Sequence, residues 1–258
     1  MNSETASPPN VRHALVIAAG RGSRFKSGTE DRPKPMIEAN GTPLVLHVLR
    51  AAGSAGITEA TIVTGYLGGV LEDFLAGQAP GDMPGGMMVR CVRNEEWERP
   101  NGISVLKARG LMPHTFALLM SDHLFEPRIL RELASAPLHD GFCRLAVDFN
   151  PSGVPDLEDA TKVMAANGRV LDIGKNLTKY NGIDTGVFLC TEGIFYGLET
   201  SISRGEECLS DAVRVLARKG KMEARDIGRL FWRDIDDEAG LLDAEYHVKN
   251  RFPNGWAL

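Results

Sequence analysis

The sequence predicts an α/β fold, a Rossmann-like doubly wound mixed sheet with a smaller β-rich lobe. Through the first half, short apolar runs rich in β-branched residues alternate with longer amphipathic segments. This alternation is typical of strands joined by helical crossovers, which form a mostly parallel sheet buried on both faces. After about residue 136, strand patterns joined by tight turns become more frequent. The 258 residues are enough for one large α/β domain with its own core.

The first half supplies most of the predicted parallel sheet. The expected strands are 13–18, 59–64, 87–92 and 115–120, and the expected helices are 43–56, 68–77, 102–110 and 127–135. Because carboxyl ends of parallel strands share one edge of a sheet, the loops that follow these strands are expected to meet there.

The second half is predicted to be laid onto that sheet. Strand patterns cover 142–148, 159–174 and 182–190, and helical patterns cover 208–220 and 237–250. The tripeptide at 167–169 is a hairpin signal. We expect a disordered N-terminus over 1–12 and one domain over 13–250. That domain would have a first lobe at 13–135, and a second lobe with the C-terminal helix at 136–250.

Composition excludes several classes of protein. The net charge of −5 argues against a general nucleic-acid binder. No run approaches the ~20 apolar residues that a membrane span needs, so no membrane insertion is expected. The polar residues 1–10 resemble neither a secretory signal nor an anchor. Four cysteines, Cys91, Cys143, Cys190 and Cys208, are far apart, which predicts reduced packing residues and a cytoplasmic location.

The stretch from Val16 to Met36 combines a strand end, three glycines and several basic side chains. Gly20 and Gly22 let the backbone turn tightly, and backbone N–H groups around such a turn form an anion-binding concavity. The P-loop pattern is absent, and Phe25 stands where a dinucleotide fingerprint needs its third glycine. A solvated basic loop is the competing interpretation.

Two prolines frame Lys34 in the segment Arg32-Pro33-Lys34-Pro35. Proline restricts its own backbone and that of the preceding residue. We therefore expect an extended backbone that delivers the Lys34 ammonium to a fixed point.

Acidic residues follow two further expected strands. Asp122 comes just after an apolar strand and should reach the sheet edge that carries the glycine loop. Alternation places Asp234 and Asp236 on one face, and Asp237 is expected to cap the helix that follows. Such carboxylates suit Mg²⁺, although each alone is equally compatible with a turn or a helix cap.

Two other segments contain polar residues near expected strand ends. Asn94 and Asn101 offer amide groups suited to a pyrimidine edge, and Gly102 would let a base lie against the backbone. A plain loop with a helix start near Ser104 is the alternative. Lys162 and Lys175 lie near strand ends of the second half, where lone lysines are usually solvated.

The paired motifs "AAGRGSR" and "RPKPM" resemble the signature of nucleotidyltransferases that join a nucleoside triphosphate to a sugar or alcohol phosphate. The resemblance implies that the lobe at 13–135 binds the nucleotide and that the lobe at 136–250 binds the acceptor. It implies that the glycine loop wraps the triphosphate, with Arg24 and Lys34 as catalytic residues. It implies nucleotide contacts by Ala18, Ala19, Gly20, Gly22, Ser23, Asn94, Asn101, Gly102 and Ser104.

Four motifs, "DHLF", "DATKV", "IGK" and "DTGVF", resemble one branch of that superfamily, the CTP:inositol-1-phosphate cytidylyltransferases. The resemblance covers Ala14 to about Asn250. It implies CMP transfer from CTP to inositol 1-phosphate, and Mg²⁺ held by Asp122 and Asp236, with Asp234 as a further candidate. The acceptor pocket would be lined by Glu158, Asp159, Lys162, Lys175, Asp184 and Thr185, with Lys175 on the acceptor phosphate.

The chain departs from that branch in two loops, between Arg24 and Lys34 and over 93–102, and no fused membrane domain is expected. Other triphosphates and other acceptors, such as a hexose 1-phosphate, phosphocholine or an aminoalkylphosphonate, therefore stay open. A non-catalytic nucleotide sensor is a second alternative. The sequence leaves open a homo-oligomer, and a downstream membrane phosphatidyltransferase that uses the product.

Overall fold

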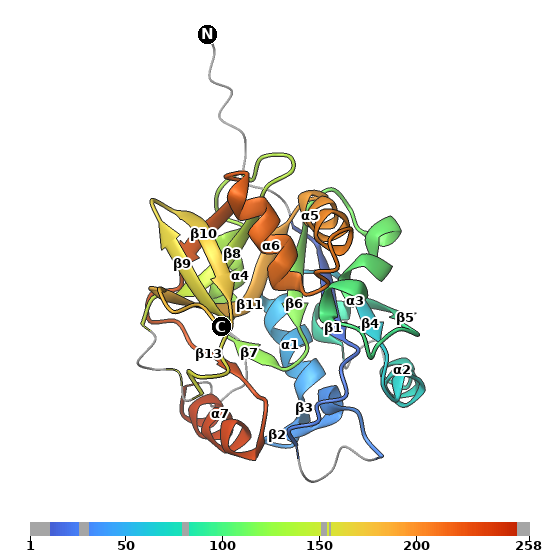
Figure 1. Cartoon of the computed structure of the whole chain (residues 1–258). Coiled ribbons are helices and arrows are strands. Elements are labelled where there is room, and N and C mark those ends of the chain that lie inside the picture. The colour runs from blue at the N-terminus through green and yellow to red at the C-terminus, as the bar shows by residue number, and fades with distance from the viewer. Residues whose placement is uncertain (1–10, 26–30, 79–82, 151–153, 155, 252–258) are drawn as a thin grey trace.

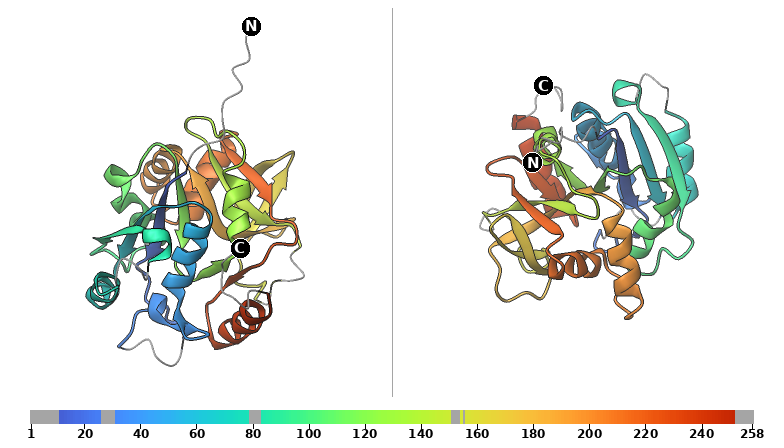
Figure 2. Two further views of the ribbon diagram at one scale, coloured as in Figure 1. Left: turned by 180° about the vertical axis from the view of Figure 1, so that it is seen from behind. Right: turned by 90° about the horizontal axis from the view of Figure 1, so that it is seen from above.

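The computed structural model describes residues 11–25, 31–78, 83–150, 154 and 156–251 (Figure 1). Nine strands form one mixed sheet, with helices packed on both of its faces (Figure 2). The predicted fold class, a Rossmann-like α/β fold with a mixed sheet, is confirmed. The expected disorder of residues 1–12 falls mostly on residues 1–10, which lie outside the described part of the chain.

The described part of the chain forms thirteen strands, seven α-helices and three short 3₁₀ turns. The strands of the main sheet are β1 (His13–Ala18), β4 (Glu59–Thr64), β5 (Met88–Arg93), β6 (Phe116–Met120), β8 (Cys143–Asp148), β9 (Lys162–Ala166), β10 (Arg169–Gly174), β11 (Gly182–Cys190) and β12 (Met222–Asp226). Two small ribbons pair β2 (Glu38–Ala39) with β3 (Thr42–Pro43), and β7 (His123–Phe125) with β13 (Trp232–Asp234). The helices are α1 (Leu44–Ser54), α2 (Gly68–Ala76), α3 (Asn101–Lys107), α4 (Pro127–Leu133), α5 (Gly193–Ile202), α6 (Leu209–Arg218) and α7 (Glu238–Arg251). Short 3₁₀ turns are η1 (Lys34–Met36), η2 (Pro84–Gly86) and η3 (Arg109–Leu111).

The strand order in the main sheet is β5-β4-β1-β6-β11-β8-β12-β10-β9. The four strands of the first half are parallel, as predicted. β11 then joins the sheet antiparallel to β6 and also pairs with β8 and β9. Hydrogen bonds therefore run without a break from the first half of the chain into the second. The boundary between the two lobes stays a prediction.

Each face of the sheet has its own hydrophobic core. On one face Val16 packs with Leu49 of α1 and Ile129 of α4. On the other, Leu118 packs with residues of α5 and α6, such as Leu198 and Leu216. A strand buried on both faces needs apolar side chains at every position, which explains the continuous apolar runs of β1 and β6. In a third, smaller cluster, Phe25 and Leu124 pack with Val248 of α7.

The structure confirms the predicted hairpin and helix cap and corrects the predicted role of one cysteine. Asn167 and Gly168, with φ of 51° and 71°, make the expected hairpin between β9 and β10. The Oδ1 atom of Asp237 accepts a hydrogen bond of 2.8 Å from the Gly240 amide, as expected of a cap of α7. All four cysteines are free, but packing is the wrong role for Cys208, which is exposed at the N-cap of α6.

No helix in the described ranges combines the length and the apolar character that a membrane crossing requires.

His47 generates a prediction about stability. The side chain is 5 % exposed, and its Nε2 donates a hydrogen bond of 2.9 Å to the Ala39 carbonyl, which ties α1 to β2. Burial lowers the pKa of His47 below its usual value. Because the unfolded chain takes up this proton near pH 6.5 and the folded chain resists it, acid should favour unfolding.

We expect the stability advantage of the wild type over His47→Gln to shrink as the pH falls from 7.5 to 5.5, by at most about 1.4 kcal/mol per pH unit. Urea unfolding of both proteins at each pH measures it. An advantage that stays constant or grows on acidification would contradict the assignment.

Candidate active site

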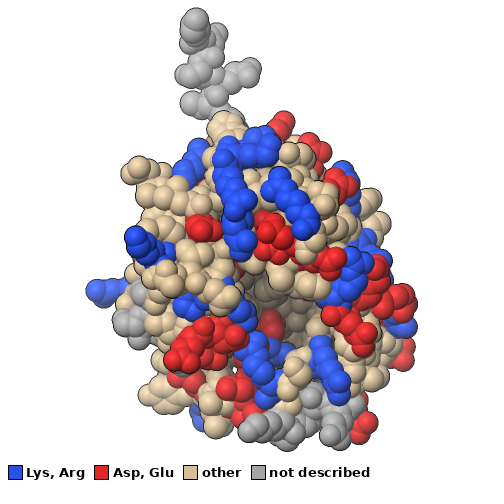
Figure 3. Space-filling model, in the orientation of Figure 1, with Lys and Arg blue, Asp and Glu red and all other residues tan. Residues whose placement is uncertain are grey.

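A cavity of about 600 Å³ opens between α6 and α7, beside the ends of β6 and β13. In Figure 3 it is the hollow near the centre of the face, with acidic atoms inside and basic side chains at its edge. Of the predicted site residues, it is lined by Arg24, Asn101, Asp122, Asp159, Lys175, Asp184, Asp234 and Asp236. Segments far apart in the sequence thus meet where the sheet topology predicts.

A buried ammonium holds the centre of this site. Lys34 Nζ lies 2.6 Å from Asp122 Oδ2 and 2.7 Å from Asp236 Oδ1, and the lysine side chain is only 7 % exposed. Burial alone would lower the pKa of Lys34, but Asp122, Asp236 and Asp234 outweigh it and raise that pKa. In turn, burial would raise the pKa of Asp122, whereas Lys34 and His123 outweigh burial and lower it. Lys34 and Asp122 therefore carry their charges at neutral pH.

The glycine turn and Lys34 are in direct contact. Gly22 has φ of +68°, and a Cβ there would stand 2.7 Å from Lys34 Cβ, so only glycine lets the lysine stem pass. The expected extended backbone at Lys34 is wrong, because only Pro33 is extended and Lys34 begins η1. A proline in the first turn of a helix loses no hydrogen bond, so Pro35 is compatible with that turn.

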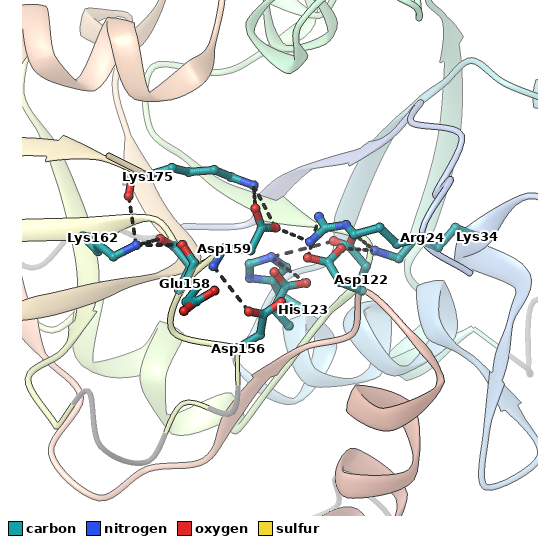
Figure 4. Close-up of polar contacts among 12 residues, drawn as sticks. Arg24, Lys34, Asp122, His123, Asp156, Glu158, Asp159, Lys162 and Lys175 are labelled. Atoms are coloured by element: carbon teal, nitrogen blue, oxygen red, sulfur yellow. Dashed lines mark hydrogen bonds and ion pairs between the residues drawn. The ribbon is translucent and has the colours of Figure 1, made fainter. Parts of the chain in front are cut away.

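A chain of ion pairs leads from this centre across the cavity (Figure 4). Arg24 Nη2 lies 2.7 Å from Asp236 Oδ2, and Arg24 Nη1 pairs with Asp159. The Asp159 carboxylate also accepts hydrogen bonds of 2.8 and 2.9 Å from Lys175 Nζ. The glycine loop of the first half is thereby joined to the turn after β10 in the second.

His123 is a site residue that the sequence analysis left without a role. Its Nδ1 donates a hydrogen bond of 2.8 Å to the Thr185 carbonyl, and its Nε2 lies 3.4 Å from Asp234 Oδ1. Burial would lower the pKa of His123, but Asp234 and Asp122 outweigh it and raise that pKa. Gly186, with φ of +73°, makes room for the ring, because a Cβ there would stand 2.3 Å from His123 Nδ1.

Three groups at this point could hold a metal ion. Asp122, His123 and Asp234 each present a ligand atom, and these atoms lie within 4.8 Å of one another. Asp234 Oδ1 is buried, and no described residue donates a hydrogen bond to it. Burial raises the pKa of Asp234 to about 7. His123 opposes this rise, whereas the charges of Asp122 and Asp236 add to it. A divalent cation would stabilise the charged form of Asp234, so the oxygen-rich group fits such an ion.

On the predicted base-binding side, several polar groups are occupied within the protein. Asn94 is fully buried, donates a hydrogen bond of 3.0 Å to Ser104 Oγ, and holds the start of α3. Asn101 lines the cavity and accepts a hydrogen bond of 2.9 Å from the Leu209 amide. A Cβ on Gly102 would stand 2.3 Å from the Glu207 carbonyl oxygen, so this glycine is also required for packing.

On the predicted acceptor side, Lys162 has a structural role. Its Nζ donates to the carbonyl oxygens of Glu158, Ala160 and Lys175 at 2.9, 3.3 and 2.9 Å. Thr185 is fully buried and donates a hydrogen bond to a backbone carbonyl. Lys162, Glu158 and Thr185 are absent from the described lining of the cavity. Asp184 does line it, and burial raises its pKa to about 6.

Gly186 generates a prediction about the site. We expect Gly186→Ala to destabilise the fold by about 2–4 kcal/mol, because a positive-φ penalty adds to the clash with His123. Gly168→Ala is the matched control, with φ of +71° but open space around a Cβ. It should cost only about 1–2 kcal/mol. Chemical denaturation measures both, and equal losses would show that His123 does not fill this space.

The chain is similar in sequence to known nucleotide-dependent transferases and synthases. The family model described as the MobA-like NTP transferase domain matches residues 14–154, more than half of the chain. A "Bifunctional IPC transferase and DIPP synthase" from Rubrobacter xylanophilus is 34 % identical over 95 % of this chain and 52 % of its own length. A "CMP-5'-(3-aminopropyl)phosphonate synthase" from Streptomyces rubellomurinus is 33 % identical over 53 % of this chain and 21 % of its own length. The chain spans about half the length of the bifunctional relative.

Among solved structures, the inositol-1-phosphate CTP transferase from T. maritima superposes with a TM-score of 0.81 at 28 % identity. It covers 96 % of this chain and 98 % of its own. A UDP-glucose pyrophosphorylase complexed with UDP-glucose, 20 % identical, covers 93 % of this chain and 99 % of its own with a TM-score of 0.78, and so shares the fold. With the family match over 14–154, these findings establish that the chain belongs to the MobA-like NTP transferase family of nucleotidyltransferases.

Proposed function

We propose that this chain is a cytidylyltransferase that transfers CMP from CTP to inositol 1-phosphate and releases pyrophosphate. One observation carries the proposal. Arg24 and Lys175, which come from the two halves of the chain, line one cavity, and shared carboxylates link them to each other and to the buried Lys34 beside it. Such a line of cations suits a triphosphate and a second phosphate held side by side. Similarity over nearly the whole chain to the T. maritima inositol-1-phosphate CTP transferase supports these substrates.

In this reaction a phosphate oxygen of inositol 1-phosphate attacks the α-phosphorus of CTP in line with the leaving group. A new oxygen–phosphorus bond forms at the α-phosphorus, and the bond from that phosphorus to the bridging oxygen breaks as pyrophosphate leaves. The attacking phosphate is already anionic, so no general base is required. Arg24 and Lys34 would offset the charge at the α-phosphorus, where fixed cations in a partly buried site act strongly.

Mg²⁺ is part of the proposal. Asp122, with Asp234 or Asp236, would hold it. When bound, it would neutralise charge on the triphosphate. Asp234 Oδ1, which is buried and accepts no hydrogen bond from the described residues, favours Asp234 beside Asp122, since both oxygens of Asp236 already face cations. The task of the chain itself is to keep these carboxylates together, and Lys34 and His123 perform it.

Contacts to the two substrates are proposed for residues at the cavity. The glycine loop and Asn101 would face the nucleotide, with Gly20 and Ser23 exposed for that purpose, and the buried Gly102 would fix the start of α3 behind Asn101. Lys175 and Asp184 would face the acceptor. Asn94, Ser104, Lys162 and Thr185 would support these contacts from behind. The proposal includes a cytoplasmic enzyme whose product a membrane phosphatidyltransferase could consume.

An aminoalkylphosphonate is a second candidate acceptor. The cavity lining contains the carboxylates of Asp156, Asp184 and Asp243, which could bind an ammonium group as readily as they accept hydrogen bonds from ring hydroxyls. The 33 % identity to the Streptomyces rubellomurinus synthase over 138 residues favours this alternative over the other acceptors.

The substrates can be tested with a panel that pairs each of four nucleoside triphosphates with inositol 1-phosphate, an aminoalkylphosphonate, phosphocholine or glucose 1-phosphate. We expect pyrophosphate release to be fastest with CTP and inositol 1-phosphate, and to stop when EDTA removes Mg²⁺. A higher kcat/KM with another pair would replace the proposed substrates. Nucleotide binding without pyrophosphate release from any pair would support a sensor.

Removing Lys34 and removing Arg24 should both lower kcat but should affect the melting temperature differently. Lys34→Ala should lower kcat by at least about 10²-fold, and it should also lower the melting temperature, because it leaves two partly buried carboxylates without their cation. Arg24→Ala should lower kcat with little change in melting temperature, since this side chain is 47 % exposed. Arg128→Ala, at an exposed ion pair on α4, is the control and should change neither. Near-normal turnover of Lys34→Ala would refute the mechanism.

A further inference from the structure

The Asp159 carboxylate lies between two cations from different halves of the chain. Arg24 reaches it from the glycine loop, and Lys175 reaches it from the turn after β10, at 2.8 and 2.9 Å (Figure 4). The resemblance assigned Asp159 to a pocket for ring hydroxyls. In the structure its two oxygens face cations instead. A small anion held between an arginine and a lysine has the surroundings of a bound phosphoryl group.

These contacts are weak enough to be exchanged. The side chains of Arg24, Asp159 and Lys175 are 47 %, 38 % and 51 % exposed, and ion pairs at such exposure typically contribute less than about 1 kcal/mol. The Lys34 pairs are buried and belong to the framework of the site. An incoming phosphate with two negative charges can therefore compete for Arg24 and Lys175 while the pairs of Lys34 remain.

The backbone around Asp159 is fixed by Lys162. Its ammonium binds the carbonyl oxygens on both sides of Asp159, at Glu158 and Ala160, and that of Lys175. The Asp159 amide also donates to Asp156 Oδ1 at 3.3 Å. With its backbone held in this way, Asp159 can leave the two cations by rotation of its side chain. The same Lys162 ammonium holds the backbone of Lys175 through its carbonyl oxygen.

The charges of the chain of ion pairs balance. Lys175, Arg24 and Lys34 alternate with Asp159, Asp236 and Asp122, three cations with three carboxylates. Anionic substrates would enter a site whose cations are already neutralised. If Asp159 turns away, Lys175 and the Nη1 group of Arg24 become available, while Arg24 Nη2 stays with Asp236 and the buried pairs of Lys34 remain.

We propose that the Asp159 carboxylate occupies a phosphoryl-binding position between Arg24 and Lys175 in the substrate-free protein, and that a substrate phosphate displaces it. The inference rests on the proposed function only in identifying that anion as a substrate. Asp159 is thus a positioning residue that competes with phosphate, rather than a contact to the acceptor ring.

The test measures binding of inorganic phosphate and of pyrophosphate by calorimetry, with no nucleotide or acceptor present. Asp159→Asn should bind both anions about 3–10-fold more tightly than the wild type, because the amide does not neutralise Arg24 and Lys175. Asp73→Asn is the charge-matched control. Asp73 is exposed on α2 and outside the described lining of the cavity, and its variant should stay within twofold of the wild type.

Adding Lys175→Gln to Asp159→Asn should abolish the gain, which ties the effect to this pair of cations. Unchanged or weaker anion binding by a folded Asp159→Asn would overturn the proposal. Steady-state kinetics give a second readout, since displacement predicts a lower KM for the phosphorylated acceptor and a ring contact predicts a higher one. If the substrate panel fails while anion binding tightens, the proposed function is wrong and the inference stands.

Discussion

The site depends on one buried interaction, the Lys34 ammonium between the carboxylates of Asp122 and Asp236. Burying such charges is costly unless each finds its partner, so the three segments that carry them must be placed together. The glycine turn at Gly22 lets the lysine stem pass. Asp122 follows β6, and Asp236 follows β13. The cavity is therefore a product of the sheet topology and of this ion pair acting together.

The sequence predicted the sheet well where strands are buried on both faces. The runs at 13–18 and 59–64 match β1 and β4 to the residue, because continuous apolar runs ended by glycine or polar residues have one reasonable interpretation. It also brought Asp122 and the glycine loop to one edge, since parallel strands end together. The turn at Lys34 was missed, because two flanking prolines restrict the backbone but do not choose between an extended segment and a 3₁₀ turn.

The sequence alone did not predict the roles of residues that contact distant segments of the chain. Gly102 is required where α3 meets the Glu207 carbonyl, a hundred positions further along the chain. Lys162 resembled any lone lysine, yet its ammonium binds three backbone carbonyls. His123 directly follows Asp122, which the sequence did single out. Only the structure shows that the His123 ring fills the space next to Gly186. Residue type and spacing do not determine which of several polar groups a folded chain will use internally.

The continuity of the sheet through β11 has a consequence for how two ligands could influence each other. A hinge between the halves would have to break the hydrogen bonds between β6 and β11, so rigid-body closure is not an available route. Communication would instead run through Asp159, whose one carboxylate faces both Arg24 and Lys175. Whichever ligand arrives first would move that carboxylate for both, and the second would bind more tightly. By thermodynamic reciprocity, this synergy would be equal in both orders of addition.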